Sequence, residues 1–157
     1  MECFFNNEGA VYLTIQLEED AVLIELLPEH IIGYEYVVQN QIKILDAILN
    51  ELLKQYPKMQ AQYGYDEEEK VEYMPDVSHI QDFSPLLSPG TMSVLDVSKD
   101  GFPYIGFIFS CKWDEEHAFG AMIYKDRVVA IGGADTAFLY WIAQNDLDKC
   151  MGKESEE

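Results

Sequence analysis

The stretch that decides the fold is Tyr104-Ile-Gly-Phe-Ile-Phe-Ser-Cys111, a nearly unbroken apolar run. Aromatic and β-branched residues dominate it, and these residue types favour extended backbone. Without polar residues at every second position, such a strand has no face suited to water. We therefore expect it to lie at the centre of a β-sheet.

Other strands are expected on both sides of this run. Residues 11–17 alternate between apolar and polar side chains, which is typical of a half-buried strand, and residues 21–27 could form its hairpin partner. Turn residues at Lys99-Asp-Gly101 and at Lys125-Asp-Arg127 separate further strands. These further strands are expected over residues 91–97, 118–124 and 128–131.

A different spacing predicts one long helix from about residue 34 to residue 56. Apolar side chains recur three and four positions apart, at Val38, Ile42, Leu45, Leu49, Leu52 and Tyr56. This spacing places them on one helical face. Pro57 is expected to end the helix. The apolar face either packs on the sheet, which we favour, or forms a dimer seam.

The expected fold class is α+β: an antiparallel sheet of about six strands packed against one long helix and a short C-terminal helix. Asp135 or Thr136 is expected to cap the short helix, which would run to about Asn145. The acidic run at residues 63–70 is expected in a surface loop, and residues 81–87 in a short helical turn. Residues 1–148 are predicted to form a single domain, followed by a polar tail at 149–157.

The composition limits the possible partners. The formal net charge is −19, from 29 acidic and 10 basic residues. Such a charge repels nucleic acid and anionic lipid, and it attracts a basic protein surface, although acidity can also serve solubility alone. The odd number of cysteines, three, fits a reducing cytoplasm better than a disulfide framework. No signal peptide or membrane span is expected, and no cofactor.

The most unusual segment is Cys111-Lys-Trp-Asp-Glu-Glu-His-Ala-Phe-Gly120, which is expected to connect two antiparallel strands. One interpretation is a metal site formed by Asp114, Glu116 and His117. Neighbouring residues of an extended chain point to opposite sides, and neither of the other two histidines has metal-site spacing to His117. This interpretation therefore needs ligands from elsewhere.

A catalytic interpretation pairs Cys111 with His117, or Glu116 with His117. No oxyanion hole or nucleophile elbow accompanies them, and Cys111 follows an apolar strand, where an inert buried thiol is expected. We therefore predict no catalytic residues.

Two interpretations explain more of the segment. In the structural one, Trp113 packs over the strand ends, Asp114 accepts backbone hydrogen bonds, and His117 ties the turn to the helix start near Asp135. In the recognition one, the turn presents an aromatic anchor surrounded by carboxylates to a basic partner. The candidate binding residues are Trp113, Asp114, Glu115, Glu116, His117 and Asp135.

The string from Gly101 to His117, followed by Gly120 and by Val128-Val-Ala-Ile-Gly-Gly-Ala-Asp135, resembles a family of small uncharacterised bacterial proteins. That family is marked by C-x-W-D-x-E-H-G and by a later G-x-A-D-T. The resemblance is weaker before Asp76-Val-Ser-His79, and this sequence departs from the motif at Ala118, where the motif has glycine.

The resemblance implies no activity, and small acidic bacterial domains of this kind are often proposed as immunity proteins. We expect an acidic, cytoplasmic, non-enzymatic binding protein, monomeric or homodimeric, for which an immunity-type inhibitor of a basic toxin is one form. The alternative is a metal-dependent hydrolase that uses the W-D-E-E-H turn.

Overall fold

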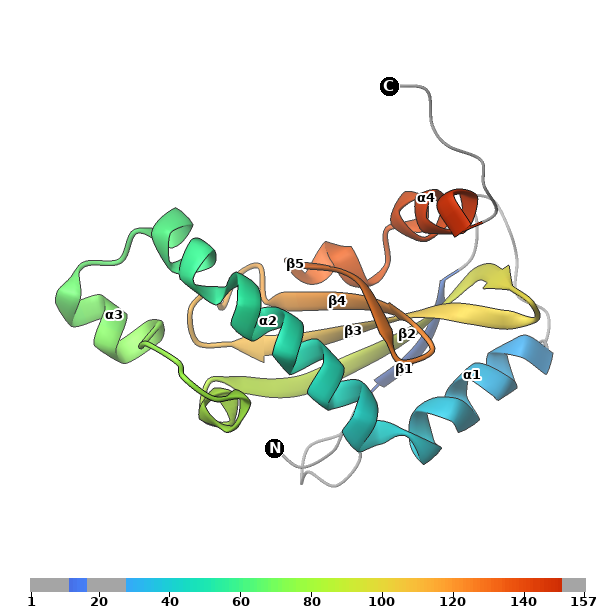
Figure 1. Ribbon diagram of the computed structural model, residues 1–157, viewed down its shortest axis with the longest axis horizontal. Coiled ribbons are helices and arrows are strands. Elements are labelled where there is room, and N and C mark those ends of the chain that lie inside the picture. Colours follow the sequence, from blue (N-terminus) through green and yellow to red (C-terminus); the bar gives the residue numbers. More distant parts are fainter. Residues whose placement is uncertain (1–11, 17–27, 151–157) are drawn as a thin grey trace.

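The computed structural model describes residues 12–16 and 28–150, which form an open five-stranded sheet with four α-helices (Figure 1). The α+β class is therefore as expected. The elements in chain order are β1 (Tyr12–Gln16), α1 (Pro28–Gln39), α2 (Gln41–Tyr63), α3 (Glu67–Tyr73), η1 (Ile80–Phe83), β2 (Leu87–Lys99), β3 (Phe102–Cys111), β4 (Phe119–Tyr124), β5 (Arg127–Gly132), η2 (Ala134–Ala137) and α4 (Tyr140–Cys150), where η denotes a 3₁₀ helix.

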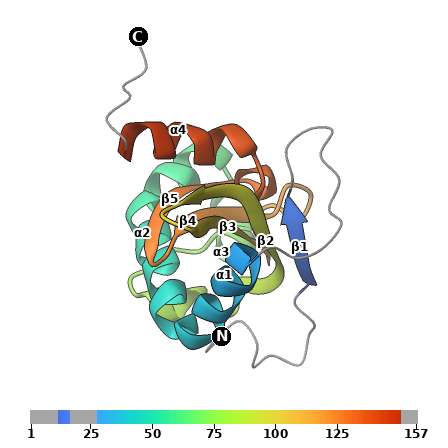
Figure 2. The same ribbon diagram turned by 90° about the vertical axis from the view of Figure 1, so that its right-hand side faces the viewer.

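The strands follow one another across the sheet in the order β1-β2-β3-β4-β5. The pairs from β2 to β5 are antiparallel, as predicted, whereas β1, at the edge of the sheet beside β2 (Figure 2), pairs with β2 in parallel. The sheet is thus mixed at its β1 edge. Three α-helices lie between β1 and β2 in the chain, and this connection is long enough for the crossover that a parallel pair requires. The expected strand at 21–27 lies outside the described residues.

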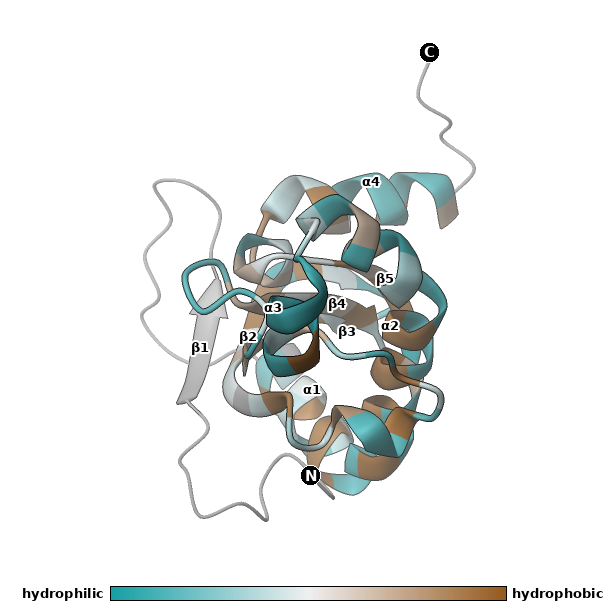
Figure 3. Ribbon diagram, turned by 90° about the vertical axis from the view of Figure 1, so that its left-hand side faces the viewer, coloured by the Kyte–Doolittle hydropathy of each residue, from teal (hydrophilic) through white to brown (hydrophobic). Residues whose placement is uncertain are grey.

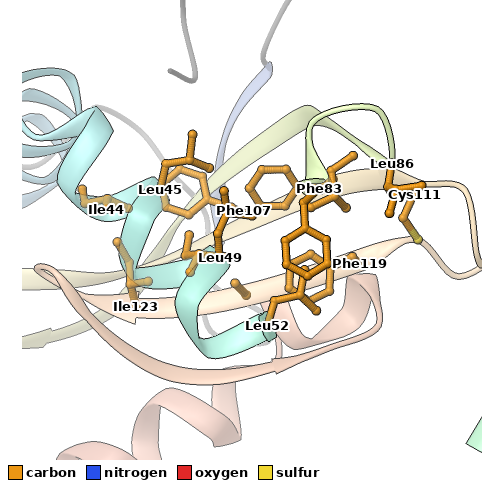
Figure 4. Packing of buried hydrophobic residues seen from close by; sticks show 14 of the residues in the cluster. Ile44, Leu45, Leu49, Leu52, Phe83, Leu86, Phe107, Cys111, Phe119 and Ile123 are labelled. Atoms are coloured by element: carbon orange, nitrogen blue, oxygen red, sulfur yellow. The ribbon is translucent and has the colours of Figure 1, made fainter. Parts of the chain in front are cut away.

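The central position predicted for the apolar run is confirmed, since β3 lies between β2 and β4. Alternate residues of β3 point to opposite faces of the sheet. Ile105, Phe107 and Phe109 join the larger core cluster with α2, in which Figure 4 shows Phe107 beside Leu45 and Leu49. Tyr104 joins a second cluster with residues of α4. Every residue of β4 is also buried. Both faces of the sheet centre are therefore covered.

The predicted long helix is two helices. The chain bends at Asn40, whose side-chain amide donates a hydrogen bond of 2.8 Å to the carbonyl oxygen of Tyr36. An asparagine side chain that binds a nearby backbone group competes with the helical pattern. The two apolar positions nearest the bend, Val38 and Ile42, are consequently exposed, whereas the four later positions of the apolar face are buried. Of the described helices, none is long and apolar enough to cross a membrane.

Pro57 lies inside α2 and does not end it, contrary to the prediction. The helix continues to Tyr63 and ends at Gly64, whose φ of +64° is the left-handed conformation typical of a glycine cap. Contacts on both sides of the proline support the continuation. The hydroxyl of Tyr56 donates to the Pro75 carbonyl at 2.8 Å, and the side chain of Gln60 donates to the Met74 carbonyl at 2.9 Å.

The acidic run beyond α2 forms a helix, α3, where a loop was expected. The Asp66 side chain accepts a hydrogen bond of 2.9 Å from the Glu69 backbone, and the Glu69 side chain reaches back to the Asp66 backbone N–H. This capping box satisfies the first backbone donors, and acidic residues in the first turn interact favourably with the helix dipole. The run of acids is therefore a helix start.

The second face of the sheet is covered by η2 and α4, which replace the single C-terminal helix expected from Asp135 or Thr136. The turn η2 approaches the sheet where two glycines face it. A Cβ atom at Gly106 would lie 1.7 Å from the Ala137 carbonyl oxygen, and one at Gly120 would lie 2.3 Å from the Gly133 carbonyl oxygen. Only glycine permits backbone contact this close.

One charged cluster fastens α4 to the sheet. The Arg127 guanidinium donates to both oxygens of the Asp146 carboxylate, at 3.1 and 2.7 Å. The buried Tyr104 of β3 donates its hydroxyl to the same carboxylate at 2.6 Å. A bidentate contact of this kind holds a carboxylate in one orientation. It therefore fixes α4 relative to β3 and β5.

We expect Gly106→Ala to lower the free energy of unfolding by about 3 kcal/mol, because the new methyl group must displace the backbone of η2. Urea denaturation measures the change. Gly133→Ala is the matched control, since its Cβ would meet atoms only at ordinary contact distances of 3.5 Å and more and should shift the value by about 0.5 kcal/mol at most. Equal losses in both variants would contradict this account of η2.

Candidate functional site

The W-D-E-E-H turn connects β3 to β4, as the sequence predicts. The Ala118 N–H donates to the Asp114 carbonyl at 2.8 Å and closes the turn, while the Lys112 N–H donates to the Leu86 carbonyl at 3.0 Å. Ala118 has a φ of +59°. Left-handed backbone is the conformation that glycine adopts without cost, and glycine is the residue of the expected motif at this position.

Trp113 is 1% exposed, so its indole cannot be the surface anchor that the recognition interpretation requires. The ring meets Tyr56 edge-on, with centroids 5.8 Å apart, and Phe119 at 6.2 Å. Its burial supports the packing role over the strand ends. Its carbonyl oxygen accepts a hydrogen bond of 2.5 Å from the hydroxyl of Tyr65.

Asp114 organises the exposed half of the turn. Its carboxylate accepts a hydrogen bond of 2.9 Å from the His117 backbone N–H and one of 2.8 Å from the Tyr63 hydroxyl. The ring nitrogen Nδ1 of His117 lies 3.1 Å from Oδ1 of the same carboxylate. Burial alone would raise the pKa of Asp114, but these contacts with His117 and Tyr63 together outweigh it and lower the pKa. The carboxylate is therefore ionised at neutral pH.

The turn is tied to η2 through backbone atoms. The carbonyl oxygen of His117 accepts a hydrogen bond of 2.9 Å from the Ala134 N–H, so the expected link to the Asp135 region exists, but through the main chain. The His117 side chain is 71% exposed. Asp135 lies in η2 with an exposed side chain, for which the described residues provide no side-chain hydrogen bond or ion pair with the turn. It is therefore not part of the same cluster.

The structure does not assemble the residues of the metal and catalytic interpretations. Asp114 and His117 form a pair, but Glu116 is exposed and joins neither of them, and no group of three His, Cys, Asp or Glu side chains in the described segments could hold a metal ion. Cys111 is buried, and burial raises the pKa of its thiol to about 11. A thiol that remains protonated at neutral pH is a poor nucleophile.

Three tyrosines that were not predicted as site residues lie beside the turn. Tyr63, Tyr65 and Tyr73, together with residues 112–117, line a surface hollow of about 540 Å³, which we call the tyrosine hollow. The rings of Tyr63 and Tyr65 are parallel, with centroids 6.1 Å apart, and Tyr73 lies 5.8 Å from Tyr65. The sequence signal was the pair Tyr63-Gly-Tyr65, but nothing local linked it to a turn about fifty residues later.

The rim of the tyrosine hollow is acidic. The side chains of Glu115 and Glu116 are exposed and form no ion pair or hydrogen bond with other described residues. The neighbouring helix α3, which supplies Tyr73, adds the exposed Glu67, Glu68 and Glu72 and is strongly hydrophilic (Figure 3). Lys70 of the same helix is paired with Asp76 at 3.0 Å. Although Lys112 lines the same hollow, Glu115 and Glu116 thus form no ion pair with the described residues.

We expect Asp114→Asn to lower the free energy of unfolding by about 1–2 kcal/mol at pH 7, because charge-assisted hydrogen bonds from His117 and Tyr63 are weakened. A lowered folded-state pKa stabilises the fold above the unfolded value, about 3.9, and this contribution is lost as pH falls through the folded value. The difference between the wild type and the variant should therefore shrink in urea titrations near pH 3.

Glu116→Gln is the control for this prediction, because the side chain is exposed and has no partner among the described residues. It should change the free energy of unfolding by less than about 0.5 kcal/mol at either pH. A loss in Asp114→Asn that is the same at pH 3 and pH 7 would contradict the role assigned to the charge.

We expect Ala118→Gly to raise the free energy of unfolding by about 0.5–1 kcal/mol, because relief of the left-handed strain exceeds the added backbone entropy of glycine. The melting temperature should rise by about 2 °C. Ala61→Gly, at an exposed position inside α2, should instead lose about 1 kcal/mol. A lower melting temperature for Ala118→Gly would show that position 118 is not strained.

Comparison with known proteins gives a family without an activity. No curated protein and no solved structure matches the chain. The match to a family covers residues 2–139, which include the whole W-D-E-E-H turn and the tyrosine hollow. The family is uncharacterised, as expected from the sequence. The chain belongs to the family described as a domain of unknown function, DUF6985.

Proposed function

We propose that this protein is a non-enzymatic binding protein that docks a basic protein partner on the tyrosine hollow and its acidic rim. The observation that carries the proposal is the position of Glu115 and Glu116, two exposed carboxylates that form no ion pair with the described residues, next to three clustered aromatic rings. Aromatic anchors and complementary charge are the features that dominate protein interfaces.

The distribution of charge supports this surface. Elsewhere several acids have basic partners within the molecule, such as Asp126 with Lys43 at 2.9 Å and Asp146 with Arg127 at 2.7 Å. The carboxylates of the rim and of α3 are part of a net charge of −19 and concentrate negative charge beside the tyrosine hollow. Such a field accelerates encounter with a basic surface and repels nucleic acid.

The tyrosines take the anchoring role that the recognition interpretation gave to Trp113. Tyr63 and Tyr73 are 39% and 36% exposed, and a tyrosine side chain offers a large contact area with few rotatable bonds. The buried Trp113 contributes indirectly, because it holds the turn on the core beside Tyr56. An immunity-type inhibitor of a basic toxin is one form of this function, by an analogy of size and charge.

A hydrolase receives no comparable support. Its metal would require Asp114, Glu116 and His117 to converge, and Glu116 does not join the other two. The Asp114 carboxylate is engaged by Tyr63 and His117, which suits a rigid turn.

The test is isothermal titration calorimetry of the full protein with a basic peptide that contains equal numbers of lysine and arginine residues. We expect Glu115→Gln combined with Glu116→Gln to weaken binding roughly three- to tenfold, since each exposed charge pair contributes about 0.2–1 kcal/mol. Raising the salt concentration from about 0.05 to about 0.5 M should also weaken binding, because it screens exposed charges.

Glu35→Gln combined with Asp46→Asn is the matched control. It removes the same charge from exposed positions on α1 and α2, which do not line the tyrosine hollow. Binding should change less than about twofold. Equal weakening by both double variants would show that only the total charge matters and would overturn the proposed surface, as would binding that does not respond to salt.

A further inference from the structure

The three rings of the tyrosine hollow form a row, with Tyr65 in the middle. Tyr63 is parallel to Tyr65 within 3°, and Tyr73 is inclined to Tyr65 by 37°. The outer two rings are exposed, while Tyr65 is half-buried between them. Ring surface, which carries the negative side of the aromatic quadrupole, is therefore available to a ligand in the hollow.

Two of the three hydroxyl protons are already engaged. Tyr63 donates to the Asp114 carboxylate at 2.8 Å, and Tyr65 donates to the Trp113 carbonyl at 2.5 Å. Burial, followed by the neighbouring Asp114 carboxylate, raises the pKa of both phenols, so both remain neutral at physiological pH. Donors for an anionic ligand are consequently scarce in the hollow, whereas ring faces and oxygen acceptors remain.

The charges around the hollow have one dominant sign. Its lining contains Asp114, Glu115 and Glu116, and the only side chain of fixed positive charge among the lining residues is Lys112. A phosphate or carboxylate ligand would meet this field unfavourably. An apolar side chain would gain nothing from the two rim glutamates. A cation satisfies both the rings and the carboxylates.

We propose that the tyrosine hollow receives an arginine side chain of the partner. The inference rests on the proposed function and specifies its ligand chemistry. A guanidinium is planar, weakly hydrated and able to stack on an aromatic ring while it donates two parallel hydrogen bonds to one carboxylate. An ammonium group is a compact charge that keeps its water in a hollow as open as this one, so it gains less from the rings.

The hollow is also held in shape before any ligand arrives. Gly64 ends α2 between the two stacked tyrosines, and the Asp66 capping box fixes the start of α3 immediately after them. The hydroxyls of Tyr63 and Tyr65 fasten the rings to the turn across a large sequence separation. Little conformational freedom remains to be lost on binding, which favours a specific contact.

The experiment compares three peptides of one basic sequence that differ only at the cationic positions, which hold arginine, lysine or trimethyllysine. We expect the full protein to bind the arginine peptide roughly two- to fivefold more tightly than the lysine peptide, as expected for a cation–π contact at an exposed site. Tyr73→Leu should remove this preference. Its hydroxyl forms no hydrogen bond with the described residues, so the substitution leaves the Tyr63 and Tyr65 contacts in place.

Tyr34→Leu is the matched control, because Tyr34 is 39% exposed, as Tyr63 is, but lies on α1 at the other end of the molecule from α3 (Figure 1). It should keep the arginine preference. Thermal melts of both variants establish that each is folded.

The outcomes separate this inference from the proposed function. Equal affinity for the arginine and lysine peptides, with binding still dependent on Glu115 and Glu116, would overturn the arginine assignment and leave the basic partner in place. Tightest binding of the trimethyllysine peptide would replace the guanidinium by a quaternary ammonium ligand and also overturn the assignment. No measurable binding of any of the three peptides would overturn both proposals.

Discussion

The contact of η2 with the glycines of β3 and β4 is the constraint on which the rest of the structure depends. Gly106 and Gly120 bring the backbone of η2 against the sheet, so main chain covers part of the face opposite α2 and α4 covers the rest. This contact also fixes the position of Ala134, whose N–H holds the carbonyl oxygen of His117. The packing of η2 on the sheet therefore also sets the position of the W-D-E-E-H turn, through this hydrogen bond to His117.

The W-D-E-E-H turn has a buried part and a solvent-exposed part. Trp113 points into the core against Tyr56, and the next residue, Asp114, ties the turn to Tyr63 at the end of α2. Glu115 and Glu116 then remain exposed to water and form no ion pair with the described residues. Trp113 and Asp114 thus join the turn to α2, which lies far away in the sequence. Glu115 and Glu116 carry the negative charge that faces the solvent.

The sequence predicts those features that depend on local pattern, including the central strand, the antiparallel pairing of β3 with β4 and of β4 with β5, and the limits of the turn. It fails where a distant contact overrides a local preference. Pro57 was expected to end a helix, but Tyr56 and Gln60 are held by a later segment and the helix continues. For Trp113 the sequence left two roles open, packing over the strand ends and a surface anchor, and only its contacts with the distant Tyr56 decide for packing. The role of Tyr63 depends on a partner 51 positions away, which no local pattern reveals.

The contact between Arg127 and Asp146, which holds α4 on the sheet, bears on whether two copies of the protein could bind each other. The chain has a single arginine, Arg127, and both terminal nitrogens of its guanidinium donate hydrogen bonds to Asp146. One copy of the protein therefore has no spare guanidinium to insert into the hollow of another. If the hollow takes a guanidinium, as proposed above, Arg127 of a second copy could compete for it only after its contact with Asp146 is broken, so the attachment of α4 would also disfavour self-association through the hollow.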